Sequence, residues 1–209
     1  MDNFDNLKKQ NERGVFGVQG HIKIFDPSSN EIFVDKRNAI NYENFAIALA
    51  NGVSNQGLGF ISEMAFGNGG TIVDQTGIIS YLTPNVIGVE ASLYNQLYYK
   101  NVDKRQVYDI DPSRNFMEVR HVAGAYYADV MVNCLLDFAE PSGQYSFDNA
   151  TNPKDTFVFD EIGLRGYGVN GAGTGPLLTH VIFHPVQKSL NRMIQIEYTV
   201  RIQSLTSGM

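Results

Sequence analysis

The sequence contains a single cysteine, Cys134, and no tryptophan. One cysteine excludes a disulfide within the chain and a zinc site built from several cysteines. No apolar run approaches the roughly 18 to 20 residues that a membrane-spanning helix needs. The first residues, Met1–Asn6, also lack the basic and apolar regions of a secretory signal. We therefore expect neither a membrane segment nor a secretion signal.

Basic side chains are also scarce. The 209 residues include 16 Lys and Arg against 22 Asp and Glu, which gives a formal net charge of −6. Non-specific binding of nucleic acid needs clustered basic groups that displace counterions, so this balance argues against it. Apolar residues make up 43% of the chain, enough to form a core. The length suits one domain of moderate size.

Alternation of apolar and polar residues is the dominant pattern. It is clearest over residues 194–203 and recurs over residues 128–138. Residues 21–26 and 31–35 alternate on either side of four turn-forming residues, which predicts a hairpin. One-sided alternation is typical of antiparallel sheets that share a core. The sequence therefore predicts a mainly β fold: an antiparallel, jelly-roll-like β-sandwich with one short α-helix and long loops.

The expected helix is the one segment with a helical period. An alanine-rich stretch places Phe45, Leu49 and Val53 four residues apart. Asn41 is the predicted N-cap, and Gly52 is the predicted end.

The N-terminal residues follow neither period. The first fourteen are polar and rich in Asn. We predict an N-terminal arm over residues 1–14 and a single β-sandwich domain over residues 15–209. The arm is expected either to remain flexible or to become ordered against a neighbouring subunit.

Candidate catalytic and metal-binding side chains are few. His180 and His184 are four residues apart, but in a strand this spacing separates them by about 13 Å, too far to share a metal ion. We expect both to be structural, with their ring nitrogens hydrogen-bonded. Cys134 is expected in the core. Asp160 and Glu161 are neighbours in a strand, so they should point to opposite faces and not form an acid–base pair.

Other motifs of known chemistry are incomplete. Residues 67–70 and 171–176 are rich in glycine, but they lack the Lys-Ser or Lys-Thr and the helix of a phosphate-binding loop. Asp109, Asp111 and Asn115 offer oxygen ligands without the glycine and glutamate of an EF-hand, so we expect a surface turn. The sequence predicts no catalytic residue, no cofactor and no metal.

Paired tyrosines suggest contact surfaces. The pairs are Tyr98–Tyr99 and Tyr126–Tyr127. Tyrosine offers a large contact area at low entropic cost and is common at interfaces. We favour subunit contacts for these residues, and contact with a glycan stays open as an alternative.

Three short motifs follow one another in a fixed order. They are AFGNGG at Ala65–Gly70, EIGL at Glu161–Leu164 and FHPVQK at Phe183–Lys188. The ordered set resembles a family of tailed-bacteriophage virion proteins, in which AFGxGG, EIGL and F-x-P-[IV]-x-K recur. Over residues 20–203, the layout is similar to the N-terminal domains of tail-collar and tail-fibre proteins.

The resemblance implies a non-enzymatic structural subunit of the neck, collar, tail or baseplate. Such a subunit would self-assemble as a ring or trimer and anchor other tail components such as fibres, without nucleic-acid or membrane partners. It would be part of the virion after assembly in the bacterial cytoplasm, where thiols stay reduced. Because the sequence ends soon after the last expected strand, we expect a compact subunit rather than a fibre. A capsid decoration (cement) protein and a host-glycan-binding module stay open as alternatives.

The same motifs assign roles to particular residues. Gly67, Gly69, Gly70 and Gly163 would let the backbone turn or approach a neighbouring segment closely. Pro185 would end its strand. Lys188 would be exposed just beyond that strand end. None of these roles is catalytic.

Overall fold

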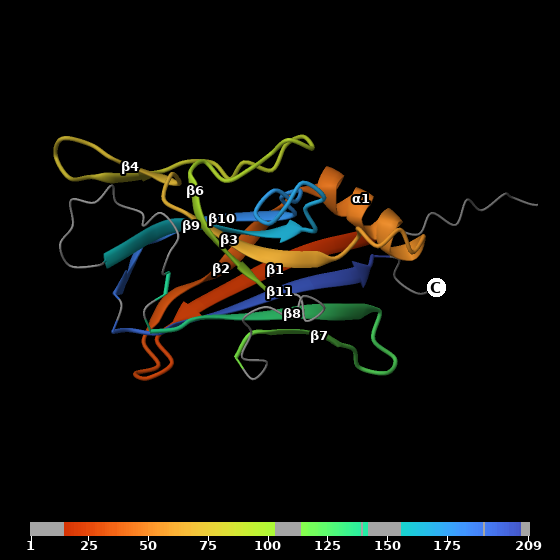
Figure 1. The fold of residues 1–209 in the computed structure, drawn as a ribbon. Coiled ribbons are helices and arrows are strands. Elements are labelled where there is room, and N and C mark those ends of the chain that lie inside the picture. The colour runs from red at the N-terminus through yellow and green to blue at the C-terminus, as the bar shows by residue number, and fades with distance from the viewer. Residues whose placement is uncertain (1–14, 103–113, 139, 142–155, 190, 206–209) are drawn as a thin grey trace, which may run out of the picture.

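The computed structural model describes residues 15–102, 114–138, 140–141, 156–189 and 191–205 (Figure 1). The predicted arm, and Asp109 and Asp111 of the predicted surface turn, lie outside these residues.

Nine antiparallel strands form one curled sheet in the order β6-β3-β9-β10-β2-β1-β11-β8-β7, and β4 and β5 form a separate hairpin. The prediction of a mainly β, antiparallel sandwich with one short helix is confirmed. The strands are β1 (Phe16–Phe25), β2 (Ile32–Ile40), β3 (Ile61–Gly67), β4 (Thr71–Val73), β5 (Ile79–Tyr81), β6 (Gln96–Asn101), β7 (Phe116–Arg120), β8 (Tyr127–Leu136), β9 (Thr156–Gly166), β10 (Thr179–Ser189) and β11 (Ile194–Ser204).

The sheet curls so that its first half, β6-β3-β9-β10, and its other half, β2-β1-β11-β8-β7, enclose one core. Phe66 of β3 and Tyr198 of β11 belong to the same buried cluster, although these strands lie in different halves. Strand β6 crosses from the first half toward β8 (Figure 1). There the Lys100 ammonium donates to the Leu135 carbonyl at 2.7 Å. This contact joins an edge strand of one half to the other half.

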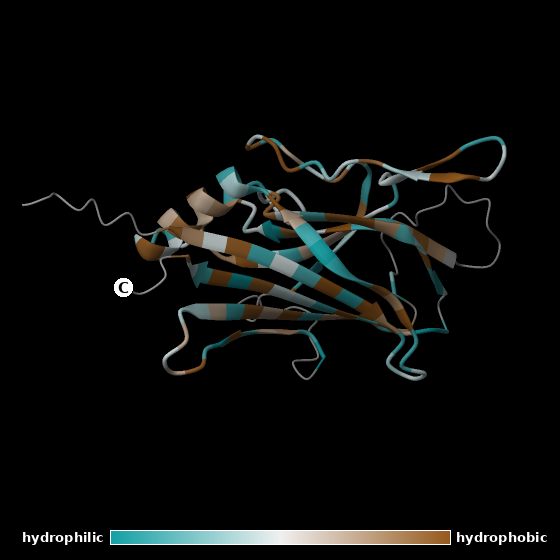
Figure 2. Cartoon of the chain, turned by 180° about the vertical axis from the view of Figure 1, so that it is seen from behind, coloured by the Kyte–Doolittle hydropathy of each residue, from teal (hydrophilic) through white to brown (hydrophobic). Residues whose placement is uncertain are grey.

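The alternation seen in the sequence matches the burial of the strands. Figure 2 shows it as bands of brown and teal along the long strands. Cys134 is fully buried in β8, as expected, and burial raises the pKa of its thiol to about 12. In β11 four of the five predicted inward side chains are fully buried, namely Ile194, Ile196, Tyr198 and Val200, and the fifth, Ile202, is partly buried.

Helix α1 spans Tyr42–Val53. Asn41 is its N-cap, as predicted, because its side-chain oxygen accepts the Asn44 N–H at 3.0 Å. The predicted end at Gly52 is wrong, since the helix continues one residue further and Ser54 caps it. With 12 residues, this single helix of the described chain is too short to span a membrane.

The apolar stripe of α1 is buried only at its N-terminal end. Phe45 is 6% exposed, whereas Leu49 is 38% and Val53 is 90% exposed. The prediction of a helix was therefore correct, but the buried residues of α1, Asn44 and Phe45, lie near its N-terminal end.

Two predictions for β10 are wrong. The strand does not end at Pro185, because its pairing with β9 shifts register between Ile182 and Val186, and this irregularity accommodates a residue without an N–H. Lys188 is 1% exposed, and its ammonium donates to the Ser189 carbonyl at 2.9 Å. Burial lowers the pKa of Lys188 to about 8.

Candidate functional site

The three motifs of the resemblance meet in space. Strands β3, β9 and β10 are consecutive in the sheet. Ala65 pairs with Gly163, and Gly67 pairs with Glu161. Across the other edge of β9, Val186 of the third motif pairs with Phe159, two residues before the second motif. The three motifs therefore lie on three neighbouring strands.

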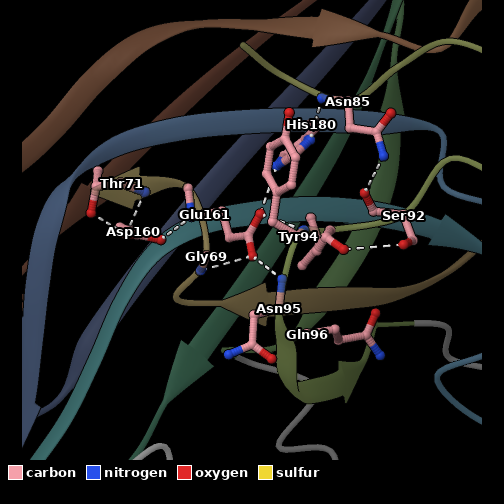
Figure 3. Close-up of polar contacts among 12 residues, drawn as sticks. Gly69, Thr71, Asn85, Ser92, Tyr94, Asn95, Gln96, Asp160, Glu161 and His180 are labelled. Carbon is pink, nitrogen blue, oxygen red and sulfur yellow. Dashed lines mark hydrogen bonds and ion pairs between the residues drawn. The ribbon is translucent and has the colours of Figure 1, made fainter. Parts of the chain in front are cut away.

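The centre of this site is a buried pair of side chains, Glu161 and His180 (Figure 3). Both side chains are 0% exposed. His180 Nδ1 accepts the Asn85 backbone N–H at 2.8 Å, so the ring proton lies on Nε2. Nε2 donates that proton to Glu161 Oε2 at 3.0 Å. Both ring nitrogens are hydrogen-bonded, as predicted for a structural histidine.

The Glu161 carboxylate also binds three backbone N–H groups. Oε2 accepts from Tyr94 at 2.9 Å, and Oε1 accepts from Asn95 at 2.8 Å and from Gly69 at 3.1 Å. Burial alone would raise the pKa of Glu161, but the His180 bond and the three backbone bonds outweigh it, and the pKa is lowered. The group is thus a charged carboxylate held by four donors.

Asp160 binds the next amides along the same turn. Its carboxylate accepts the Gly70 and Thr71 N–H groups, each at 2.9 Å, and a short bond from the Thr71 hydroxyl. Burial raises the pKa of Asp160, and the charge of Glu161 adds to the rise despite these bonds. The two carboxylates hold separate sets of donors, in line with the expectation that they form no dyad. We call Asp160, Glu161 and His180 the clamp.

The glycines around the clamp leave no room for a larger side chain. A Cβ on Gly67 would lie 2.5 Å from the Asn95 carbonyl, and one on Gly69 would lie 2.8 Å from a backbone nitrogen. A Cβ on Gly70 or Gly163 would lie 2.9 or 2.5 Å from a neighbouring side chain. None of the four is among the residues with positive φ. Of the two predicted roles, close approach therefore accounts for these glycines.

The clamp holds a layer formed by residues 68–95, which contains β4 and β5 and lies over the sheet (Figure 1). Two amides near the start of α1 hold the same layer. Asn41 Nδ2 donates to the Gly88 carbonyl at 2.9 Å, and Asn44 Nδ2 donates to the Val89 carbonyl at 3.2 Å. The layer is thus bound to the body by polar contacts at several points along its length.

A small apolar cluster supplements these polar contacts. It consists of Ala65, Leu93 and Leu177. Most of the large apolar side chains of the layer are exposed instead, and Figure 2 shows apolar colouring on the hairpin. Seven of them are exposed: Ile72, Val73, Ile78, Tyr81, Ile87, Val89 and Tyr94. Two of the seven also contact the body, since the Tyr81 hydroxyl is hydrogen-bonded to His184 Nδ1 at 3.2 Å and the Tyr94 ring lies 5.8 Å from that of His180. We call the other five residues the outer face.

The β4–β5 hairpin departs from the usual one-sided pattern, because Ile72 and Val73 are neighbours in β4 and both are exposed. Exposed apolar side chains that gather on one segment mark interaction sites on many proteins. The sequence analysis missed this face, because residues 71–90 have no clear alternation and the apolar side chains are scattered among turn formers. The one signal in the sequence is the set of apolar residues between turn-forming residues. The charged groups that hold this segment are visible only in the structure.

The predicted tyrosines lie in different environments. Tyr98 is 6% exposed, with its ring 5.6 Å from that of Phe66, so its predicted role as a contact residue is wrong. Tyr99 is partly buried. Tyr127 is also partly buried, and the Arg201 guanidinium lies 4.0 Å from its ring centroid.

Tyr126 is 74% exposed and is the one fully available ring of the four predicted tyrosines. It precedes β8, whereas Tyr98 and Tyr99 lie in β6. The two pairs therefore lie in different elements of the fold.

Two predicted turns have different outcomes. Gly171 and Gly173 adopt positive φ, as a glycine-rich turn requires. Asn115 is 3% exposed and its side-chain oxygen accepts the Leu135 N–H at 2.8 Å, so it is not part of a surface turn. Within the described ranges, no three His, Cys, Asp or Glu side chains are placed to hold a metal ion.

Comparison with known proteins identifies no relative. No family model matches the chain, and no curated protein or solved structure does either. The resemblance to tailed-bacteriophage virion proteins therefore depends on the three short motifs alone.

Proposed function

We propose that this protein is a non-enzymatic structural subunit of a tailed-bacteriophage virion. It belongs to the neck, collar, tail or baseplate, where it binds copies of itself and other tail components such as fibres. The observation that carries the proposal is the outer face, an apolar surface on a layer that charged groups hold in place.

The clamp supports a structural role. A general base needs a free lone pair within hydrogen-bond reach of its substrate. The Glu161 carboxylate is fully buried and already accepts four hydrogen bonds. Its contacts fix the path of the layer instead. A surface that is rigid before association loses less conformational entropy on binding, which favours a permanent interface.

Size-exclusion chromatography with light scattering tests self-association. We expect a discrete oligomer for the wild-type protein and a shift to monomer when Ile72 and Ile87 are both replaced by Asp. Ile32→Asp is the matched control, since Ile32 is 53% exposed, close to the 56% of Ile72, but lies in β2. A wild-type monomer, or a double variant that assembles normally, would overturn the proposal of a self-associating subunit.

Antibody labelling of virions in the electron microscope tests the location. Label on the neck, tail or baseplate supports the proposal, and label on the capsid supports a decoration protein instead. Absence of label from virions would contradict both. The glycan-binding alternative has less support, because Tyr126 alone of the four predicted tyrosines is mostly exposed.

A further inference from the structure

A second apolar feature lies at one end of the sandwich. A groove of about 280 Å³ opens between α1 and the other half of the sheet. Its lining includes Phe45, Leu49, Ile61, Val119, Val130 and Ile202. Glu118 is the one charged residue among those that line it. A groove of this size can accept an aromatic ring together with an aliphatic side chain.

The N-terminal arm leaves the body beside this groove. Phe16, the first residue of β1, pairs with Ser204 of β11, two residues beyond Ile202 in the groove wall. The Leu205 N–H donates to the Val15 carbonyl at 2.7 Å, which fixes the point of departure. Val15 and Phe16 are 51% and 71% exposed.

The arm carries suitable apolar side chains. Residues 1–14 contain Met1, Phe4 and Leu7, whereas the C-terminal residues 206–209 contain Met209 as their one large apolar residue. Leu7 is eight residues from Val15, a span of up to about 27 Å when extended. The arm is therefore long enough to reach beyond its own subunit.

We propose that this groove binds the N-terminal arm of a second copy of the chain, with Phe4 and Leu7 as apolar anchors. β1 begins at this end, so a chain that continued its line backward would extend beyond the sandwich. Reaching the subunit's own groove would require the chain to reverse, whereas reaching the groove of a neighbour would not. The inference rests on the proposed self-association, and it uses a surface separate from the outer face.

Fluorescence anisotropy with a labelled synthetic peptide of residues 1–14 tests the groove. The acceptor is the full chain with Phe4 and Leu7 replaced by Asp, so that its own arm does not compete. We expect saturable binding, and at least tenfold weaker binding of a peptide with the same two Asp replacements. Equal binding of the two peptides, or no saturable binding, would overturn the inference.

Variants of the acceptor localise the binding. Leu49→Glu and, separately, Val119→Glu place a charge in the groove and should each weaken peptide binding at least tenfold. Val53→Glu is the control, because Val53 is 90% exposed on the same helix and does not line the groove. Circular dichroism confirms that each variant is folded. If Val53→Glu weakened binding as much as Leu49→Glu and Val119→Glu, the site would not be the groove.

Cross-linking identifies which copy supplies the arm. Chains carrying Leu7→Cys are mixed with differently sized, tagged chains carrying Val119→Cys and then oxidised. A covalent heterodimer supports binding to a second copy. In a chain carrying both replacements, a cross-link that forms only within one chain would overturn binding to a second copy. If the wild-type protein forms oligomers but the groove does not bind the peptide, this inference is refuted and the proposed self-association is not. If the wild-type protein is a monomer, the proposed self-association is refuted.

Discussion

Replacement of Glu161 by Gln is the most direct test of the clamp. Gln keeps the shape of the side chain but presents one oxygen and one NH2 group where Glu161 presents two oxygens. Oε1 accepts from Gly69 and Asn95, and Oε2 accepts from Tyr94 and His180. Whichever way the amide turns, its NH2 group faces two donors, so two hydrogen bonds are lost.

A change of tautomer at His180 does not relieve this conflict. Nε2 could accept from the amide only if the ring proton moved to Nδ1, where it would face the Asn85 N–H. Hydrogen bonds to a charged group contribute about 1.5 to 3 kcal/mol each. Two lost bonds therefore predict that Glu161→Gln lowers the free energy of unfolding by about 3 to 6 kcal/mol. That is a large part of the 5 to 15 kcal/mol typical of a domain.

Glu63→Gln is the matched control. Glu63 is 4% exposed in the neighbouring strand β3, and its carboxylate accepts the Gly173 N–H at 2.8 Å. An amide oxygen can keep that bond, so we expect a loss of about 1 kcal/mol. Urea unfolding followed by circular dichroism measures both variants. If Glu161→Gln cost no more than Glu63→Gln, the geometric argument for the clamp would be refuted.

Three further predictions concern other positions. Lys188→Met should raise the free energy of unfolding by about 3 kcal/mol at pH 7, because the pKa of Lys188 is lowered from 10.5 to about 8. Because the unfolded state binds more protons at Lys188 than the folded state between these values, the advantage of the variant over the wild type should shrink from pH 8 to pH 10, and urea unfolding of both proteins across this range measures it. Gly70→Ala should cost about 1 to 3 kcal/mol in thermal unfolding, since its Cβ would lie 2.9 Å from Ile182. Asn41→Ala should cost about 1 kcal/mol through loss of the N-cap and should increase amide hydrogen exchange near Gly88.

The sandwich could be predicted because its signal is local. Alternation in β8 and β11 is a property of each segment by itself, and so is the N-cap at Asn41. The same rule could have been applied to the tyrosine pairs. Adjacent residues of a strand face opposite sides, so in a strand with one face against the core only one of Tyr98 and Tyr99 can be on the surface.

The clamp could be predicted only in part, because it depends on register and on loop geometry. His180 is predicted from the sequence to be structural, and Glu161 is predicted only to form no acid–base pair with Asp160. Their contact requires the alignment of β9 with β10. The bond from Asn85 requires the path of the layer as well. Lys188 was misplaced for a related reason, since the register shift beside Pro185 changes which positions of β10 face inward.

The positions of the outer face and the groove bear on the kind of assembly. The outer face lies on the layer, and the groove lies at the end of the sandwich where β1 begins. A two-fold dimer joins the same patch on both subunits, whereas contacts between different patches join copies head to tail and close into rings when the rotation allows it. An arm from one copy seated in the groove of the next gives a ring when each copy binds the arm of a different neighbour, and a two-fold dimer when two copies exchange arms reciprocally. The mass of the wild-type oligomer distinguishes these two assemblies. Helix α1 connects the layer and the groove, because Asn41 and Asn44 bind the layer while Leu49 lines the groove.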